Sequence, residues 1–563
     1  MPVSAAVGAF RSAKLTEFVR RALPTLVVGT LALGALLRIR QYVGRRSLWL
    51  DELSVALNLA SRGFLDLLQP LDYNQAAPVL FLWIQELATR VGGLGELTLR
   101  FAPLVCGIAL LPVAWIAARR LLEPWAAACA VLLLAVSPLL VWHANEVKPY
   151  AGDALASAAM IVLALRILDG PGDRIRWRWL MAGGAVALLG STPAVFVLGG
   201  VALALVLDPA IHRDPLARRR AAATFAIWGV TFAFLYFAFY RTVAQSGFMQ
   251  RYWQKEFLRV DVSLPGTLWR EAMHLLEAAF LSYVPGSALT ISTSLGLVLA
   301  AVGAVHAARR HGVSRAALLV TPLALAVAAS VLRRYPLEPR LFLFAVPLLA
   351  LLILAGVSAF ETRRAPALLR LAGFAALFGF SVLSASWRLV KAPVKLEETR
   401  SVLAEYRDRT QGEPVVIFGH GIKSWVYYTL DWNQVDSMRL HWPKRLGAIR
   451  GADGPEYRFG MPGAGMKPRA GWAAIEAERT RRVASPCAWL FFAHYREPQV
   501  DTLIAAIADA GGSVRREVSA PGAQLHRACF PVESAKVPRV GPRPERPTAV
   551  PPASASAPGR RRA

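Results

Sequence analysis

Two neighbouring carboxylates, Asp51 and Glu52, are the first side chains in the sequence that could do acid–base chemistry. They lie in the stretch SLWLDELS (47–54), shortly after the first long apolar run, and the preceding RIRQYVGRRSLWL supplies cations. A carboxylate at the boundary between water and lipid can have its pKa shifted by burial and by neighbouring positive charges. It can then act as a general base that takes a proton from an attacking hydroxyl. The alternative is structural: Asp51 caps a short helix, ELSVALNLAS, and Glu52 interacts favourably with its dipole.

A second polar cluster, HANEVKPYAGD (143–153), interrupts two apolar runs. Polar groups at membrane depth are costly unless they are paired or face a cavity. One interpretation is a hydrated turn in which Glu146 pairs with Lys148. The other is that Lys148 and Tyr150 contact an anionic headgroup.

A third element, RRYPLEPR (333–340), ends with Arg340 at the head of a late apolar run. A guanidinium group suits the oxygens of a phosphate because it can donate two parallel hydrogen bonds. Arg333 and Arg334 are explained by snorkelling to lipid phosphates, whereas Arg340 is predicted to belong to a site.

None of these residues forms a metal-binding motif. His143 and Glu146, together with Asp51 and Glu52, could bind a divalent metal ion, but nothing in their spacing requires one. The sequence also has no phosphate-binding glycine loop, Walker motif or nucleophile elbow, which argues against a nucleotide-driven pump.

The elements that must position these residues are membrane helices. The 563 residues are 55% hydrophobic and only 18% charged, against roughly 25% charged in soluble domains. Apolar runs long enough to cross a bilayer recur from Leu23 to Trp387. The first run is predicted to be an uncleaved span, since no small-residue cleavage site follows it. We predict a polytopic α-helical membrane protein with about eleven spans, near 22–40, 99–118, 124–142, 151–168, 179–190, 193–208, 221–240, 287–308, 315–332, 341–357 and 367–387.

The net charge of +27 indicates topology rather than a nucleic-acid site, because the arginines cluster in short loops between spans. The segment 179–207 is too long for one untilted helix and is broken by GSTP. If it is a hairpin of two spans, every basic cluster falls on one face. We therefore predict a cytoplasmic N-terminus, with the extracytoplasmic segments 42–98, 143–150, 241–286, 333–340 and all residues after Trp387.

The predicted domains are a cytoplasmic segment (1–21), a transmembrane domain (22–388) that includes the first loop (42–98), a soluble α/β domain (389–531) and a disordered Pro/Arg-rich tail (532–563). In the soluble domain, strands are expected at 414–420, 487–495 and 523–530, and helices at 422–430 and 498–512. Cys487 starts one strand and Cys529 ends another. If the strands are antiparallel neighbours, the two cysteines can form a disulfide in an oxidising compartment.

Several of these motifs together resemble a known family. SLWLDELS, then NQAAPVLFLWIQELATRVGG, then HANEVKPYAGDAL occur in its order and spacing, and RRYPLEPRLFLFAVPLLALL resembles its late-span motif. LAEYRDRTQGEPVVIFGH resembles its C-terminal domain. The family is the bacterial branch of the dolichyl-phosphate-mannose–protein mannosyltransferase-like (glycosyltransferase family 39-like) enzymes, which have the GT-C fold. The resemblance covers 22–530 and implies a location in the bacterial inner (plasma) membrane, with the C-terminal domain in the periplasm.

The resemblance implies a membrane glycosyltransferase that moves a hexosyl or pentosyl group from a polyprenyl-phosphate donor to an extracytoplasmic acceptor (a protein, lipid or glycan). Inverting displacement needs a base on one side and charge stabilisation of the departing phosphate on the other. Asp51 matches the catalytic acid of the family's first loop, with Glu52 beside it. The expected phosphate-binding residues are Lys148, Tyr150, Arg340 and Arg38.

The sequence departs from the family in two places. A stretch that often reads His-Pro-Pro is AAP (76–78) here, so Asn74 and Gln75 are candidates for the acceptor side, together with His143 and Glu146 for substrate binding. EVKPY has Lys148 where many relatives carry arginine, which keeps the charge but loses the fork geometry. Two other function classes stay open, a transporter or flippase for a lipid-linked sugar and a non-catalytic protein of envelope assembly.

Overall fold

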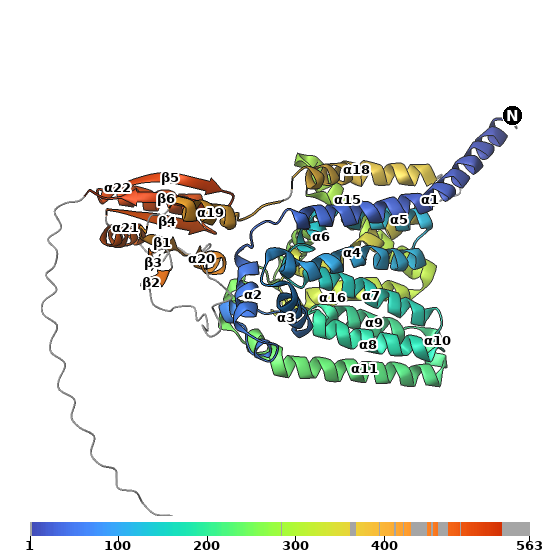
Figure 1. The fold of residues 1–563 in the computed structure, drawn as a ribbon. Coiled ribbons are helices and arrows are strands. Elements are labelled where there is room, and N and C mark those ends of the chain that lie inside the picture. The colour runs from blue at the N-terminus through green and yellow to red at the C-terminus, as the bar shows by residue number, and fades with distance from the viewer. Residues whose placement is uncertain are drawn as a thin grey trace, which may run out of the picture.

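The computed structural model of the protein describes residues 3–282, 284–360, 367–392, 394–409, 412–419, 421–429, 448–451, 454–459, 471–484 and 486–531. The predicted disordered tail (532–563) lies outside the described residues. Figure 1 shows a bundle of long, roughly parallel helices with a small sheet domain at one end.

The helical bundle confirms the predicted polytopic membrane fold. Within the described residues, eight helices are long and apolar enough to cross a membrane. Every predicted span coincides with helical structure. In chain order the elements are α1 (Val3–Val43), α4 (Glu96–Leu121), α5 with α6 (Pro124–Val136, Pro138–His143), α7 (Tyr150–Leu168), α8 (Arg174–Gly190), α9 (Ala194–Val206), α11 (Pro215–Leu235), α15 (Gly286–His311), α16 (Val313–Val331), η5 with α17 (Pro339–Ala345, Val346–Ala359) and α18 (Ala367–Lys391).

Two proline residues break predicted segments. The stretch 179–207 forms two helices, α8 and α9, which lie side by side in Figure 1 and are separated at 191–193, so the predicted break into two helices is confirmed. The predicted span 124–142 is also interrupted, at Ser137, and continues as α6. Pro138 causes this break because it has no backbone N–H to continue the ladder of α5.

Helices α15 and α17 pack with their backbones in contact. A methyl group added to Gly303 would collide with the carbonyl of Leu352, and one added to Gly356 would collide with that of Leu299. Small residues at such crossings allow close approach between membrane helices.

Two groups of short elements lie between the long helices. The first loop holds α2 (Leu50–Ser61), η1 (Asp66–Leu68), η2 (Asp72–Asn74) and α3 (Val79–Gly92). The segments on either side of α11 hold α10 (Pro209–Arg213), the π-helix η3 (Tyr236–Tyr240), α12 (Arg241–Ala244), α13 (Gly247–Tyr252), α14 (Leu264–Leu276) and the π-helix η4 (Glu277–Leu281).

The C-terminal domain is a mixed sheet between two layers of helices. The strand order is β2-β3-β1-β4-β6-β5, with β3, β1 and β4 parallel and the other neighbours antiparallel. Alternate residues of β1 enter different cores: Ile417 packs with α19 and α20, whereas Phe418 packs with α21 and α22. The elements are β1 (Val415–Phe418), β2 (Ala448–Gly451), β3 (Gly454–Phe459), β4 (Cys487–Ala493), β5 (Ser513–Ala520), β6 (Ala523–Cys529), α19 (Thr399–Arg409), α20 (Gly421–Thr429), α21 (Trp472–Val483) and α22 (Glu497–Asp509).

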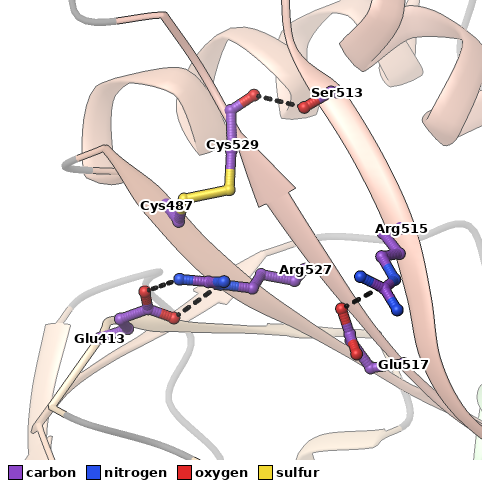
Figure 2. The surroundings of a disulfide bond; sticks show 7 residues. All are labelled: Glu413, Cys487, Ser513, Arg515, Glu517, Arg527 and Cys529. Atoms are coloured by element: carbon purple, nitrogen blue, oxygen red, sulfur yellow. Dashed lines mark hydrogen bonds and ion pairs between the residues drawn. A yellow bond between two sulfur atoms is a disulfide. The ribbon is translucent and has the colours of Figure 1, made fainter.

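The strand register explains the pairing of the two cysteines. Strands β4 and β6 are antiparallel with Cys487 directly opposite Cys529, and their sulfur atoms are bonded (Figure 2). The bond joins the start of one strand to the end of the other, as the sequence allowed. Strands β2, β3 and β5 and helix α21 have no counterpart among the predicted elements, because short or polar segments give a weak sequence pattern.

Candidate functional site

Helix α2 directs the two adjacent acids into different surroundings. One helical residue is about 100° of rotation, so neighbours on the first turn cannot share a face. The side chain of Glu52 is fully buried, whereas that of Asp51 is 24% exposed. The structural alternative, in which Asp51 caps the helix, is not what the structure shows: Trp49 occupies the N-cap position, and Glu52 Oε2 accepts the Trp49 backbone N–H at 3.2 Å.

Glu52 holds the first loop together. It accepts hydrogen bonds from Arg46 Nη1 at 2.9 Å, from Arg100 Nη2 at 2.6 Å and from the Val147 backbone N–H at 3.0 Å. Burial raises the pKa of Glu52, but the guanidinium groups of Arg100 and Arg46 lower it by more. The pKa of Glu52 therefore lies below its ordinary value. Because its oxygens are occupied by donors, we interpret Glu52 as a positioning residue rather than as a second catalytic group.

Asp51 faces cations from distant parts of the chain. Arg340, at the start of η5, donates from Nη1 to Asp51 Oδ2 at 2.8 Å, and its guanidinium lies 5.3 Å from the ring centroid of Trp253. Lys148 also acts electrostatically on Asp51. Burial raises the pKa of Asp51, but the positive charges of Lys148 and Arg340 outweigh burial and hold it below the ordinary range. Asp51 is therefore an ionised carboxylate at neutral pH.

The turn 143–150 contacts the start of α2 through hydrogen bonds. His143 Nδ1 pairs with Glu146 Oε2, and Glu146 Oε1 accepts the indole N–H of Trp49 at 2.9 Å. Tyr150 is buried with its ring edge-on to His143, 5.2 Å between centroids, and interacts electrostatically with Arg340. His143 and Glu146 are both buried and engaged with each other, so we interpret them as supports of the site rather than as open substrate ligands.

Gln75 connects the first loop to Lys148. The Lys148 ammonium donates to Gln75 Oε1 at 2.6 Å, so in place of the hydrogen-bonded Glu146–Lys148 pair, which was one of the two interpretations, each residue has a different partner. Tyr73 and Asn74 have left-handed φ angles of 62° and 54°. Consecutive non-glycine residues in this region carry strain, which accumulates at functional sites. Asn74 is exposed beside this turn.

Arg38 has a structural role. Its Nη1 donates to the carbonyls of Gly34 and Ala135, both at 2.9 Å, and its Nη2 donates to the carbonyl of Leu134 at 3.0 Å. The Leu134 carbonyl is the one left without a donor by Pro138. The guanidinium replaces that missing N–H, so the expected phosphate role of Arg38 is not supported by its contacts.

Sequence reasoning missed Lys423. It lies on α20 of the C-terminal domain, donates to Ser54 Oγ at 2.7 Å and lies 5.0 Å from the ring centroid of Tyr73. Burial lowers the pKa of Lys423 to about 8, while Asp51 opposes and Lys148 adds to the fall. A lysine between apolar residues of the short helix GIKSWVYYT was the available signal.

An apolar groove leads to Lys148. It has a volume of about 330 Å³, and Lys148 is the charged member of a lining drawn from α3, α4, α7 and α8, with Leu80, Phe81, Pro103, Leu155, Met160 and Val186 among its walls. A second apolar groove of about 250 Å³ lies against Pro339, next to Arg340, and has Glu271 and Glu338 in its lining. The polar site thus lies beside surfaces that suit hydrocarbon chains.

Within the part of the chain that the structure describes, no three histidine, cysteine, aspartate or glutamate side chains gather as a metal site.

The fold and the site define a class. This chain is a multi-pass membrane protein with the GT-C fold, in which early and late loops bring an acid and cations together at one end of the helical bundle. Residues 76–240 match the family described as dolichyl-phosphate-mannose-protein mannosyltransferase. The resemblance expected from the sequence is thereby confirmed.

A solved structure extends the likeness in fold to most of the chain. ArnT from Cupriavidus metallidurans in the apo state is 15% identical, with a TM-score of 0.50, over 90% of this chain and 98% of that one. Its undecaprenyl-phosphate-bound form has a TM-score of 0.48 at 15% identity, covering 89% and 97%. The Archaeoglobus fulgidus oligosaccharyltransferase is 13% identical with a TM-score of 0.41, over 69% and 60%. No curated protein matches this chain in sequence.

Proposed function

We propose that this protein is a membrane glycosyltransferase that moves a sugar, a hexose or a pentose, from a polyprenyl-phosphate donor to an extracytoplasmic acceptor with inversion at the anomeric carbon. The observation that carries the proposal is the Asp51 carboxylate 2.8 Å from the Arg340 guanidinium. The family match over 76–240 and the ArnT-like fold support the same class.

The groove beside the site suits the donor. A polyprenyl phosphate has a long hydrocarbon chain with an anionic end, and the groove offers an apolar lining in which Lys148 is the charged residue. Burial of the chain in the groove would hold the phosphate against Lys148 and Arg340. These cations are a point charge and a fork of donors respectively, and the fork matches two phosphate oxygens.

The reaction follows from the charges. An acceptor hydroxyl attacks the anomeric carbon from the face opposite the phosphate, and its oxygen forms the new glycosidic bond. The bond between the anomeric carbon and the phosphate oxygen breaks, and the phosphate leaves with one additional negative charge. Asp51 takes the hydroxyl proton as this bond forms. Arg340 and Lys148 stabilise the charge that develops on the leaving phosphate.

Donor binding would also raise the pKa of Asp51. Without donor, Arg340 pairs with Asp51 and, with Lys148, holds its pKa low, which makes it a weak base. A phosphate that draws the guanidinium and ammonium away removes much of this effect, and the pKa of Asp51 rises. The base would thus gain strength when the donor is in place.

The orientation in the membrane is part of the proposal. Ion pairs link Arg120 and Arg315 to Asp169, and Arg310 to Glu123, so the basic loops gather at the end of the bundle where α7 finishes. The site lies where α7 begins. The preference of basic loops for the cytoplasm and of disulfides for oxidising compartments supports a cytoplasmic N-terminus and an extracytoplasmic C-terminal domain in the bacterial inner membrane.

Mass spectrometry of envelope glycans, lipids and glycoproteins with and without the gene tests the proposal. We expect one sugar to disappear from one class of acceptor, and the purified protein to transfer that sugar from its polyprenyl-phosphate form. Unchanged envelope glycans, together with no transfer from any polyprenyl-phosphate hexose or pentose, would contradict it.

A further inference from the structure

The C-terminal domain and the first loop share one hydrophobic core. Leu53 and Leu57 of α2 are buried in the same cluster as Trp425 of α20, Tyr406 of α19 and Phe491 of β4. Figure 1 shows the domain at the end of the bundle that carries α2 and α3, with α19 and α20 on the side of the domain that faces the bundle. The domain is therefore packed onto the loop that carries Asp51.

Polar contacts fix the same interface. Tyr428 Oη accepts the backbone N–H of Leu48 at 2.7 Å and donates to Glu96 Oε1 at 3.2 Å. Arg400 donates to Glu96 Oε1 at 2.8 Å and to the carbonyl of Arg45 at 2.6 Å. Hydrophobic packing and these bonds together give α20 a defined position relative to α2.

That position brings Lys423 into the site. Ser54, its hydrogen-bond partner at 2.7 Å, is three residues after Asp51, so Ser54 and Asp51 lie on neighbouring positions of one face of α2. Lys423 also lies over the ring of Tyr73, which belongs to the left-handed turn. The residue that follows this turn, Gln75, accepts the hydrogen bond from Lys148. Asp51 and Lys148 both interact electrostatically with Lys423.

A third cation suits an anion with more than one negative charge. Arg340, Lys148 and Lys423 all act on the carboxylate of Asp51, and Arg340 also has Glu338 at 3.9 Å. A sugar phosphodiester carries one negative charge, and the phosphate monoester that it releases carries up to two. Lys423 adds a positive charge to those of Arg340 and Lys148, and this addition matters most for the more highly charged product.

We propose that Lys423 is a third phosphate-binding cation and that the C-terminal domain, by delivering it, completes the site for the lipid phosphate. The proposal rests on the function proposed above and gives the domain a role in it. Lys423 would act most strongly on the released polyprenyl monophosphate, because that species carries the larger charge.

The experiment measures binding of undecaprenyl phosphate to the purified full-length protein in detergent, with undecaprenol as the ligand that lacks the anion. For Lys423→Gln we expect affinity about tenfold lower, and for Lys423→Arg affinity within about threefold of the parent protein. Lys395→Gln removes an exposed lysine near the same domain and should leave affinity unchanged. Undecaprenol should bind all variants equally.

The variant Ser54→Ala distinguishes phosphate binding by Lys423 from a role in docking the C-terminal domain. It removes the hydrogen-bond partner of Lys423 but keeps the lysine's charge. Equal losses of phosphate affinity in Ser54→Ala and Lys423→Gln, with lowered Tm in both, would overturn the proposal in favour of docking. Parent-like affinity in Lys423→Gln would overturn it while leaving the glycosyltransferase proposal intact. If the parent protein binds undecaprenyl phosphate no better than undecaprenol, the proposed function fails, and this inference fails with it.

Discussion

Arg340 and Asp51 are 289 residues apart in the chain, yet the guanidinium of one donates to the carboxylate of the other at 2.8 Å. One comes from the first extramembrane loop and the other from the turn that precedes α17. Each was singled out by the sequence for its own reason, an acid beside a membrane span and a basic residue where few are expected. Their contact makes them one site and supports a division of labour between proton transfer and phosphate stabilisation.

Asp51→Asn should abolish most of the transfer without unfolding the protein. The amide keeps the shape of the side chain but cannot accept the hydroxyl proton, so the rate should fall by about 10²- to 10⁴-fold. Initial rates with the polyprenyl-phosphate sugar and the Tm in detergent check this. Asp66→Asn, a matched change of an exposed acid in the same loop, should keep full activity. A fully active Asp51→Asn protein would exclude Asp51 as the base.

Glu52→Gln should act mainly on stability. Removing the charge leaves Arg46 and Arg100 buried without their carboxylate, which costs about 3–5 kcal/mol when a buried ion pair is broken. Thermal unfolding followed by tryptophan fluorescence should show a clear fall in Tm, whereas Asp51→Asn should show little change. If Glu52→Gln kept the parent Tm and lost only activity, a direct catalytic role for Glu52 would be the better interpretation.

Arg38→Met should destabilise the membrane domain without a selective effect on phosphate binding. The change leaves the carbonyls of Leu134 and Ala135 without a donor in an apolar environment, at a cost of about 3 kcal/mol. Arg40→Met, on an exposed position of the same helix, is the control and should be nearly neutral. A stable Arg38→Met protein with weakened undecaprenyl phosphate binding would restore Arg38 to the site.

Donor affinity should fall as the pH rises through the pKa of Lys423, about 8. Below that pH Lys423 is charged, and above it the side chain is neutral and one phosphate-binding charge is lost. The groups that act on it are Asp51, Lys148 and Glu397. Because an arginine stays charged across this range, Lys423→Arg should give a flatter profile between pH 7 and 9. An unchanged profile in that variant would assign the titration to Lys148, whose pKa burial also lowers.

Replacing both Cys487 and Cys529 with alanine should loosen the C-terminal domain. The bond closes a separation of 42 residues, which in the chain-entropy account corresponds to about 3–4 kcal/mol. Limited proteolysis of the full-length protein should show earlier cleavage within 471–531 in the double variant. Protection equal to that of the parent protein would show that the sheet is held by packing alone.

The membrane helices were predictable because the bilayer imposes long apolar runs that can be read locally. Even the break between α8 and α9 followed from GSTP and from the requirement that basic loops share one face. The cysteine pairing was also readable, since an antiparallel neighbour places the start of β4 opposite the end of β6. Strands β2, β3 and β5 were missed because they lack a strong alternating pattern.

The sequence was enough to select candidate residues for the site but not to assign a role to each of them. Residue types and topology were enough to select Asp51, Lys148 and Arg340, but they could not separate Asp51 from Glu52, because adjacent residues look equivalent until the helix turns one into the core. The contacts of Arg38 were hidden for the same kind of reason: only the packing of α1 against the end of α5 shows that its donors are used by backbone carbonyls.

The sequence by itself determined the membrane fold, its spans and the chemistry on offer, because those depend on local composition and on the solvent that each segment meets. Only the tertiary structure decided which acid faces Arg340, that the donors of Arg38 are used by backbone carbonyls, and that Lys423 of the C-terminal domain reaches the first loop. Those facts depend on contacts between residues hundreds of positions apart, and no local pattern records them.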